Sequence, residues 1–126
     1  TTVPTSTYSE ISSGTSYNTN STTDVIVNGT YTYTPVSGTY LVIFSGEVAT
    51  GSNNRSIYIS IHLSGTQIAS TERRTYCEMS STTEFHSAST QTIITVNGSQ
   101  AIEARYRVSA GTGYINNSNF SIVRLA

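Results

Sequence analysis

Two histidines and one cysteine are the side chains of this sequence best suited to catalysis. His62 and His86 each lie far from any residue that would complete a local triad signature, and Cys77 is the single cysteine, so it has no partner for an internal disulfide. A histidine could still meet Cys77 or a serine in space and activate it as a nucleophile. Serine is so common in this chain that a serine near a histidine is expected by chance and is weak evidence for catalysis. We therefore expect surface or interface histidines, a buried Cys77 and no enzyme.

Carboxylates are the next candidates for chemistry, because glycoside hydrolysis needs a pair of them and calcium sites need clusters. The seven acidic residues are dispersed singly, and none of their spacings indicates a catalytic pair. No dense Asp and Asn loop resembles a calcium loop, and no group of histidines suits zinc. The sequence thus predicts no catalytic residue, no metal ion and no cofactor. The acidic residues are Glu10, Asp24, Glu47, Glu72, Glu78, Glu84 and Glu103.

The composition narrows the class of partner. Charged residues make up 10% of the chain, against about 25% in ordinary soluble domains. The formal net charge is -1 and there is no basic run, so the chain lacks the positive surface that a phosphate backbone requires. No apolar run is long enough to cross a bilayer. We expect no nucleic-acid partner and no membrane insertion, and a length of 126 residues fits one domain.

Short apolar segments separated by turn signals must position these side chains, and this spacing predicts an all-β sandwich or barrel. Asn28-Gly29, Ser64-Gly65 and Asn97-Gly98 suit tight turns that need a positive φ. No segment has a convincing helical period. The predicted strands cover residues 24–27, 30–34, 39–48, 56–63, 67–71, 74–79, 83–88, 90–96, 100–108, 113–115 and 119–125.

The first 23 residues differ from the rest, because Thr, Ser, Asn and Gly dominate them. We predict an extended polar arm over residues 1–23, with room for one edge strand, followed by the folded domain over residues 24–126. One interpretation of the arm is an attachment segment that lies on a partner, and the other is a frayed terminus. The residues that would contact the capsid or another partner are its scattered apolar side chains, Val3, Tyr8, Ile11 and Tyr17.

Residues 100–108 alternate with the period of a half-buried strand. Ile102, Ala104 and Tyr106 fall on one face, and charged side chains fall on the other. That charged face is either a solvated surface with cross-strand salt bridges or a contact with another subunit or a capsid, since arginine is favoured at interfaces. Its charged side chains are Glu103, Arg105 and Arg107.

Two strands are apolar on both faces. In 39–48, Leu41 and Ile43 alternate with other apolar side chains, and 119–125 has the same pattern with Val123 on its second face. A lone sandwich covers only one face of a sheet, so if these strands are neighbours their second face needs another subunit. The residues that we expect at this interface are Tyr40, Val42, Phe44, Phe120, Ile122 and Arg124.

The order of these motifs resembles that of the C1q and tumour-necrosis-factor superfamily. Pro35, Gly38, Tyr40 and Phe44 look like the family's signature leading into a central strand, and residues 57–69 are similar to its following hairpin. The resemblance continues through residues 96–106 and 119–125. It implies a compact antiparallel jelly-roll sandwich that assembles as a homotrimer.

More narrowly, residues 101–113 followed by 119–123 resemble jelly-roll domains of bacteriophage virion proteins. This implies a non-enzymatic structural protein of the virion. The polar arm and the lack of a shaft repeat favour a trimeric capsid decoration (cement) protein that stabilises the phage head from its outer surface. Its partners would be itself and the major capsid protein or another virion protein. The alternative is a tail-fibre or spike tip that binds a host-surface receptor or glycan through Tyr and Asn on loops such as 51–54 or 111–117.

Overall fold

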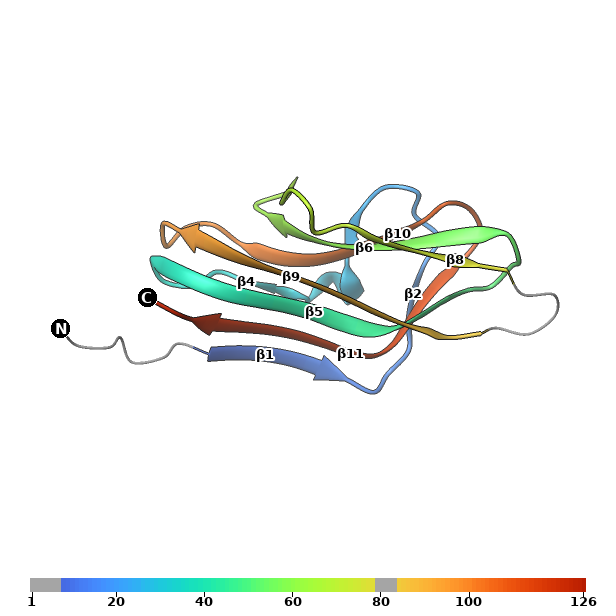
Figure 1. The fold of residues 1–126 in the computed structure, drawn as a ribbon, viewed down its shortest axis with the longest axis horizontal. Helices are drawn as coiled ribbons and strands as arrows, with labels where there is room; N and C mark the ends of the chain where they lie inside the picture. The colour runs from blue at the N-terminus through green and yellow to red at the C-terminus, as the bar shows by residue number, and fades with distance from the viewer. Residues whose placement is uncertain (1–7, 79–83) are drawn as a thin grey trace.

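Two antiparallel β-sheets face each other in the computed structural model, which describes residues 8–78 and 84–126 (Figure 1). This confirms the all-β jelly-roll sandwich. The first sheet contains β1 (Tyr8–Ser13), β2 (Tyr17–Thr19), β5 (Gly38–Thr50), β9 (His86–Val96) and β11 (Gly113–Arg124). The second sheet contains β3 (Val25–Ile26), β4 (Thr32–Tyr33), β6 (Arg55–Leu63), β7 (Thr66–Gln67), β8 (Arg73–Cys77) and β10 (Ile102–Val108).

The strand order does not follow the chain. The first sheet runs β1-β11-β5-β9, with β2 also paired to β11, and the second runs β3-β10-β6-β7, with β4 beside β10 and β8 beside β6. In the part of the chain that the structure describes, the helical element is a single 3-10 turn, η1 (Val27–Gly29). Those same residues hold no helix that is long and apolar enough to span a membrane.

The predicted turns have the backbone that their residues favour. Asn28 and Gly29 have φ values of 53° and 69°, and Gly98 has a φ of 95°. Ser64 (φ 46°) and Gly65 (φ 86°) form the tight hairpin between β6 and β7. Positive φ at both central positions matches the right-handed twist of the two strands.

Two pairs of predicted strands are in fact single strands. Residues 113–115 and 119–124 both belong to β11, which stays paired with β5 because a bulge between Asn116 and Asn119 absorbs the irregular segment. This Asn-rich stretch has the composition of a turn, and for this reason the sequence predicts two separate strands. Likewise, the predicted strands 83–88 and 90–96 run into each other in the continuous strand β9, which begins at His86.

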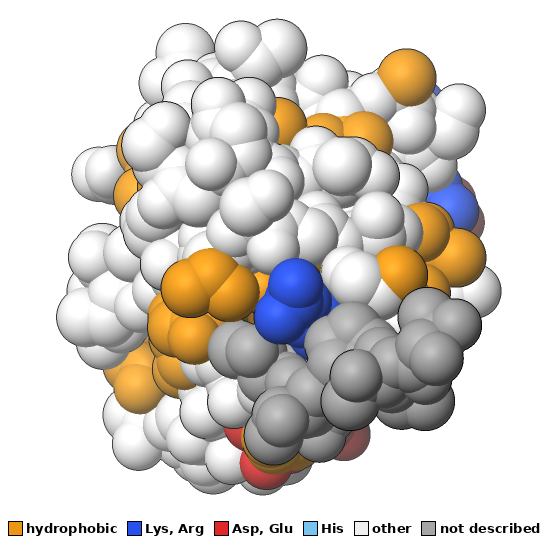
Figure 2. Space-filling view, turned by 90° about the vertical axis from the view of Figure 1, so that its left-hand side faces the viewer, with side chains coloured by type: hydrophobic (Ala, Val, Ile, Leu, Met, Phe, Trp, Pro, Cys, Tyr) orange, Lys and Arg blue, Asp and Glu red, His pale blue; other side chains and the backbone are white. Residues whose placement is uncertain are grey.

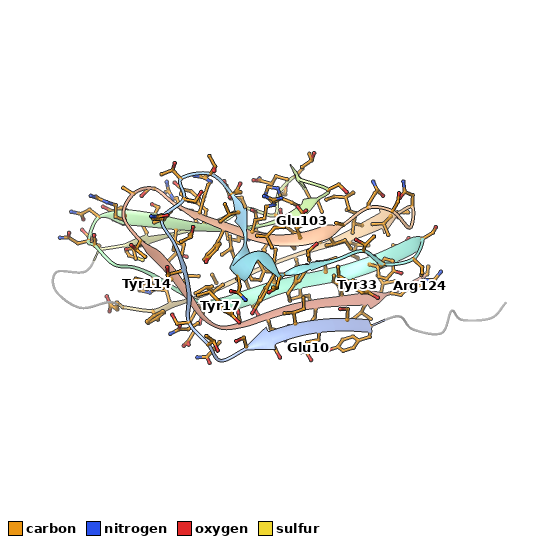
Figure 3. All side chains as sticks on the ribbon, turned by 180° about the vertical axis from the view of Figure 1, so that it is seen from behind. Glu10, Tyr17, Tyr33, Glu103, Tyr114 and Arg124 are labelled. Atoms are coloured by element: carbon orange, nitrogen blue, oxygen red, sulfur yellow. The ribbon has the colours of Figure 1, made fainter. Side chains whose placement is uncertain are left out.

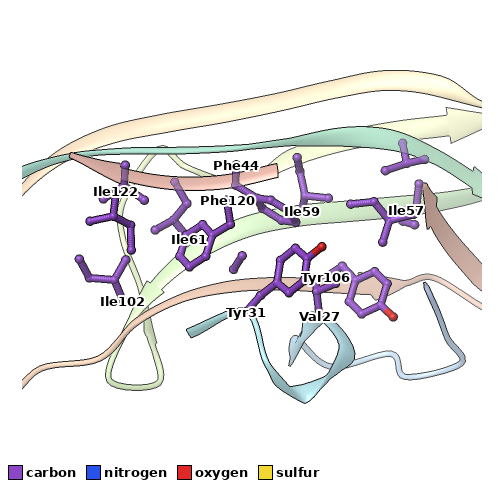
Figure 4. Packing of buried hydrophobic residues seen from close by; sticks show 14 of the residues in the cluster. Val27, Tyr31, Phe44, Ile57, Ile59, Ile61, Ile102, Tyr106, Phe120 and Ile122 are labelled. Carbon is purple, nitrogen blue, oxygen red and sulfur yellow. The ribbon is translucent and has the colours of Figure 1, made fainter. Parts of the chain in front are cut away.

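The core lies between the two sheets (Figure 4). Tyr31 stacks on Phe120 with ring centroids 6.4 Å apart, and Phe44 packs edge-on against both rings. The Tyr31 and Ser118 hydroxyl groups are 2.5 Å apart, so the buried phenol is hydrogen-bonded. Facing this cluster are three isoleucines of β6, which alternate inward with the period of two expected from the sequence. They are Ile57, Ile59 and Ile61.

The core also contains five of the six residues that we expected at a subunit interface. Each of these five is at most 1% exposed, because the second sheet of the same chain already covers them. The expectation of an interface on this face is therefore replaced by a core role, because these side chains are not accessible to another subunit. The five residues are Tyr40, Val42, Phe44, Phe120 and Ile122.

The N-terminal segment is built into the first sheet from Tyr8 onward. β1 pairs with β11 from Tyr8 opposite Val123 to Ser13 opposite Ser118, and β2 pairs with the start of the same strand. The edge strand that the arm prediction allowed is β1. Val3 lies outside the described residues.

Candidate functional site

An apolar row crosses the outer face of the first sheet from one edge to the other. Tyr8 of β1 is paired with Val123 of β11, Val123 with Leu41 of β5, and Leu41 with Ile93 of β9. Residues paired in register point to the same side of a sheet, so these four side chains form one continuous strip. We call these four residues the outer apolar strip.

The strip is open to solvent at both ends. Tyr8 is 56% exposed and Ile93 is 63% exposed, while Leu41 and Val123 between them are half-buried. Ile43 lies in the next row, and Leu125, which follows β11, is 48% exposed. Figure 2, which looks at the end of the sandwich where both termini lie, shows hydrophobic side chains gathered beside arginine. This strip is the second apolar face that the pattern of 39–48 and 119–125 required.

Arg124 closes this end of the sheet with bonds inside its own chain. Its Nη2 donates to the carbonyl oxygen of Ser37 at 3.1 Å, and its Nε donates to that of Ala126 at 3.3 Å. Gly38 makes room for this side chain, because a Cβ there would lie 2.8 Å from Arg124 Nε. The guanidinium thus holds the end of β11 against the start of β5.

The charged face of β10 is used within the chain. Arg105 Nε donates to Glu103 Oε1 at 3.0 Å, and Arg107 Nη2 donates to Glu72 Oε1 at 2.9 Å. The Arg107 guanidinium also lies 3.7 Å from the centre of the Tyr58 ring. Of the two interpretations, the structure therefore matches the one with salt bridges between neighbouring segments.

The environment of Arg107 favours its charged form. Burial opposes the charge, but the hydrogen bond that Arg107 donates to Glu72 and the negative charges of Glu72 and Asp24 outweigh burial, so that the pKa of Arg107 is raised. Asp24 Oδ1 lies 3.5 Å from Arg107 Nε and accepts no hydrogen bond. These contacts hold the segment before β3 against the outer face of β10.

A serine and a histidine do meet on this sheet. His62 Nε2 lies 3.0 Å from Ser60 Oγ and 3.5 Å from Asp24 Oδ2, and His62 Nδ1 lies 3.5 Å from the carbonyl oxygen of Gly65. A catalytic triad places the carboxylate on the opposite ring nitrogen from the serine, whereas here both approach Nε2. Ser60 is also 0% exposed, so a substrate has no access to its oxygen. The group is a structural polar cluster.

The other candidates for chemistry are separated. Cys77 is buried in the core, as predicted, and packs there as a small apolar side chain. His86 is exposed at the start of β9. Within residues 8–78 and 84–126, no three His, Cys, Asp or Glu side chains are arranged to hold a metal ion.

The remaining arm residues have two different environments. Ile11 and Tyr17 are half-buried and pack against the core, where the Tyr17 ring is edge-on to Tyr31 at 5.9 Å. Tyr8 belongs to the outer apolar strip. Two of the apolar side chains that suggested an attachment segment are thus anchors of β1 and β2 in their own sheet.

The two loops considered for glycan binding lie side by side. The Gly51 N–H donates to the carbonyl oxygen of Thr112 at 2.8 Å. Asn54 Oδ1 accepts a hydrogen bond from the Tyr76 hydroxyl at 3.1 Å, and Asn117 Nδ2 donates to Glu47 Oε1 at 2.6 Å. Both asparagine amides are therefore engaged within the protein.

The sequence did not predict a cavity that lies beside β2. Its lining combines β2 with residues around η1 and with Tyr106 of β10. Tyr17 and Asn18 are adjacent in the sequence, but Tyr106 reaches the cavity from β10, which is far away along the chain. Figure 3 labels Tyr17 within this region and Arg124 at the other end of the sandwich.

No protein-family model matches this chain, and no curated protein sequence matches it either. The VP2 subviral particle of infectious bursal disease virus aligns with a TM-score of 0.64 at 8% identity, over 98% of this chain and 33% of that chain. The T=1 particle derived from infectious bursal virus gives 0.64 at 9% identity, over 98% and 32%. The TNF protein Eiger of S. frugiperda gives 0.54 at 16% identity, over 73% and 62%.

These likenesses differ in extent. This chain spans 33% of the length of the VP2 chain and 62% of the Eiger chain. At such identities the alignments establish the fold alone. The fold of this chain is a jelly-roll sandwich similar to those of a viral capsid protein and a TNF-like protein.

Proposed function

We propose that this chain is a non-enzymatic structural protein of a virion that assembles as a homotrimer through its outer apolar strip. The observation that carries the proposal is the strip itself, which runs from Tyr8 at one edge of the sheet to Ile93 at the other. Exposed apolar patches of this kind mark contact surfaces in soluble proteins. The likeness of the fold to a capsid protein supports the virion role, and the resemblance to trimeric jelly rolls supports three copies.

The finer role that we propose is a capsid decoration (cement) protein on the outer surface of a phage head. A trimer presents each contact three times, so that three modest footprints on the major capsid protein or another virion protein reinforce one another. The charged side chains of β10 are paired within the chain, so we assign self-association to the strip and not to this charged face. The alternative is a fibre tip that binds a host receptor or glycan.

Solution mass tests the assembly directly. We expect the unmodified chain to have the mass of three copies in light scattering coupled to size exclusion, and Ile93→Asp to have the mass of one. A charge at a side chain that is 63% exposed does not disturb the core, so the circular dichroism of this variant should be unchanged.

Tyr76→Asp is the matched control, because Tyr76 is 52% exposed but lies on β8 of the second sheet. It should remain trimeric. A strictly monomeric unmodified chain, or equal dissociation by both substitutions, would overturn the proposed assembly surface.

A further inference from the structure

The first sheet ends in two strand edges that no described strand covers. Its order is β1-β11-β5-β9, so β1 borders it on one side, along the lower margin of Figure 1, and β9 borders it on the other. An uncovered edge presents unpaired backbone N–H and C=O groups, to which a further strand can add. Natural proteins normally protect such an edge with a short strand, charged side chains, proline or a bulge. An edge that lacks all of these is suited to pairing with another chain.

β9 has none of these protections. It is 11 residues long, and its residues after His86 include no charged side chain, no proline and no glycine. Its pairing with β5 keeps one register along its whole length, with no bulge. In the part of the chain that the structure describes, every other border strand of the two sheets is at most 6 residues long. The edge of β9 is therefore the one best suited to receive a strand from another chain.

The strand that fits this edge is β1 of a second copy. β1, β11, β5 and β9 are antiparallel in succession, so β1 and β9 run in opposite directions. When copies stand edge to edge around an axis along the strands, β9 of one copy is antiparallel to β1 of the next, which is the arrangement of every pair within this sheet. A contact between two different edges closes into a ring when the rotation between copies allows it. Three copies can thus join with each β9 covered by a β1.

The outer apolar strip sets the register of this pairing. Its two ends, Tyr8 on β1 and Ile93 on β9, are exposed on the same face of the sheet. Placing Ile93 opposite Tyr8 of the next copy joins the three strips into one apolar band, whereas a shift by one residue would set outward side chains against inward ones. The same register sets the exposed Gln91 opposite Glu10 of the next copy. The Gln91 amide can donate a hydrogen bond to that carboxylate, so polar and apolar side chains both match across the edge.

We propose that β9 of each copy pairs antiparallel with β1 of the next copy, with Ile93 opposite Tyr8, so that the first sheet continues from copy to copy around the trimer. This inference rests on the proposed function, because it supplies the backbone contacts of an assembly whose side-chain contacts are the outer apolar strip. It accounts for the exposure along the strip. Tyr8 and Ile93, which would meet across the edge, are exposed, while Leu41 and Val123 between them are already half-buried.

A pair of introduced cysteines tests the pairing and its register. Within one copy, Ser12 is paired with Asn119, Asn119 with Ser45, and Ser45 with Ser89. Three strand spacings separate Ser12 from Ser89 by about 14 Å, which is too far for a disulfide inside one copy. In the proposed register Ser12 of one copy lies opposite Ser89 of the next. The double variant Ser12→Cys with Ser89→Cys should therefore give disulfide-linked dimers and trimers on a non-reducing gel after mild oxidation.

Ser12→Cys with Ser87→Cys is the matched control. Ser87 is exposed on the same face of β9 as Ser89 but lies two residues away, a diagonal position at about 7–8 Å that a disulfide does not readily span. This pair should link far less than the first, and each single variant should stay unlinked. Equal linking of the two pairs would overturn the proposed register. Linked dimers from Ser89→Cys alone would instead show that β9 pairs with β9 of another copy, and would overturn the pairing with β1.

A charge at Gln91 gives a second measurement that needs no cysteine. Gln91→Glu sets a carboxylate against Glu10 of the next copy, and like charges directly opposite each other on neighbouring strands are destabilising. The midpoint of trimer dissociation should therefore shift to a higher protein concentration in Gln91→Glu and not in Gln91→Lys. Equal midpoints in the two variants would overturn the placing of Gln91 opposite Glu10.

Light scattering separates the failure of this inference from the failure of the proposed assembly. If the unmodified chain and the Ser12→Cys, Ser89→Cys variant both have the mass of three copies but the variant gives no disulfide links, the edge pairing is overturned and the trimer stands. If the unmodified chain has the mass of one copy, the proposed trimer and the edge pairing are both overturned.

Discussion

Ser60 Oγ and His62 Nε2 are 3.0 Å apart on the outer face of β6, and the serine has no exposed surface. The two residues are in the sequence arrangement i and i+2, which places them on the same face of a strand. Asp24 approaches the same ring nitrogen at 3.5 Å. The pair therefore fastens the segment before β3 to the sheet, and its geometry is that of a structural contact.

Ser60→Ala should lower the free energy of unfolding by about 1 kcal/mol, the typical net value of a buried hydrogen bond. Urea unfolding followed by circular dichroism measures this change. Hydrolysis of activated esters by the unmodified chain should not exceed the buffer rate. An ester hydrolysis rate that disappears in Ser60→Ala would instead show that the serine is a nucleophile.

Phe44→Ala should lower the free energy of unfolding by about 3–5 kcal/mol, because it removes a large side chain from a closely packed core. Phe44 is 0% exposed and contacts Tyr31 and Phe120 within one chain. Denaturant unfolding measures the loss. If Phe44 were an interface residue, its substitution would lower the mass in solution and spare the stability of the monomer.

Alkaline pH should destabilise the protein through Tyr106. Burial raises the pKa of Tyr106 to about 12, whereas an unfolded tyrosine ionises near 10. Because the unfolded state loses its proton first, the free energy of unfolding falls as the pH rises from about 10 to about 12, by at most ~1.4 kcal/mol per pH unit. Urea unfolding at successive pH values measures the slope, which should be smaller in Tyr106→Phe. An equal slope in both proteins would contradict a raised pKa.

Removal of residues 1–7 should leave the trimer and the stability of the fold unchanged, and should weaken attachment to capsids that lack this protein. The deletion must stop there, because the next residue, Tyr8, is already paired with Val123. A longer deletion through residue 19 removes β1 and β2 and should reduce the free energy of unfolding. Co-sedimentation with capsids measures the first effect, and undiminished attachment of the shorter chain would rule out a role for this segment.

The period of two in 56–63 and 100–108 was enough to predict the inward faces of β6 and β10, because each strand is apolar on one side only. β5 and the second half of β11 were different. With apolar side chains on both faces, the sequence could not tell which set fills the core, and it is the covering sheet that decides. The sequence could not predict the cavity either, because Asn28 and Tyr106 come together only through the pairing of β3 with β10.

β11 stands between β1 and β5 in the first sheet, and it is the last strand along the described chain. The two earlier strands pair with it and not with each other. Closing this sheet therefore requires contacts between opposite ends of the sequence, and such non-local pairing slows folding. β1 can join the sheet only after β11 has formed, whereas β5 can already pair with β9. We therefore expect local hairpins, such as β6 with β7, to form before β11 completes the first sheet.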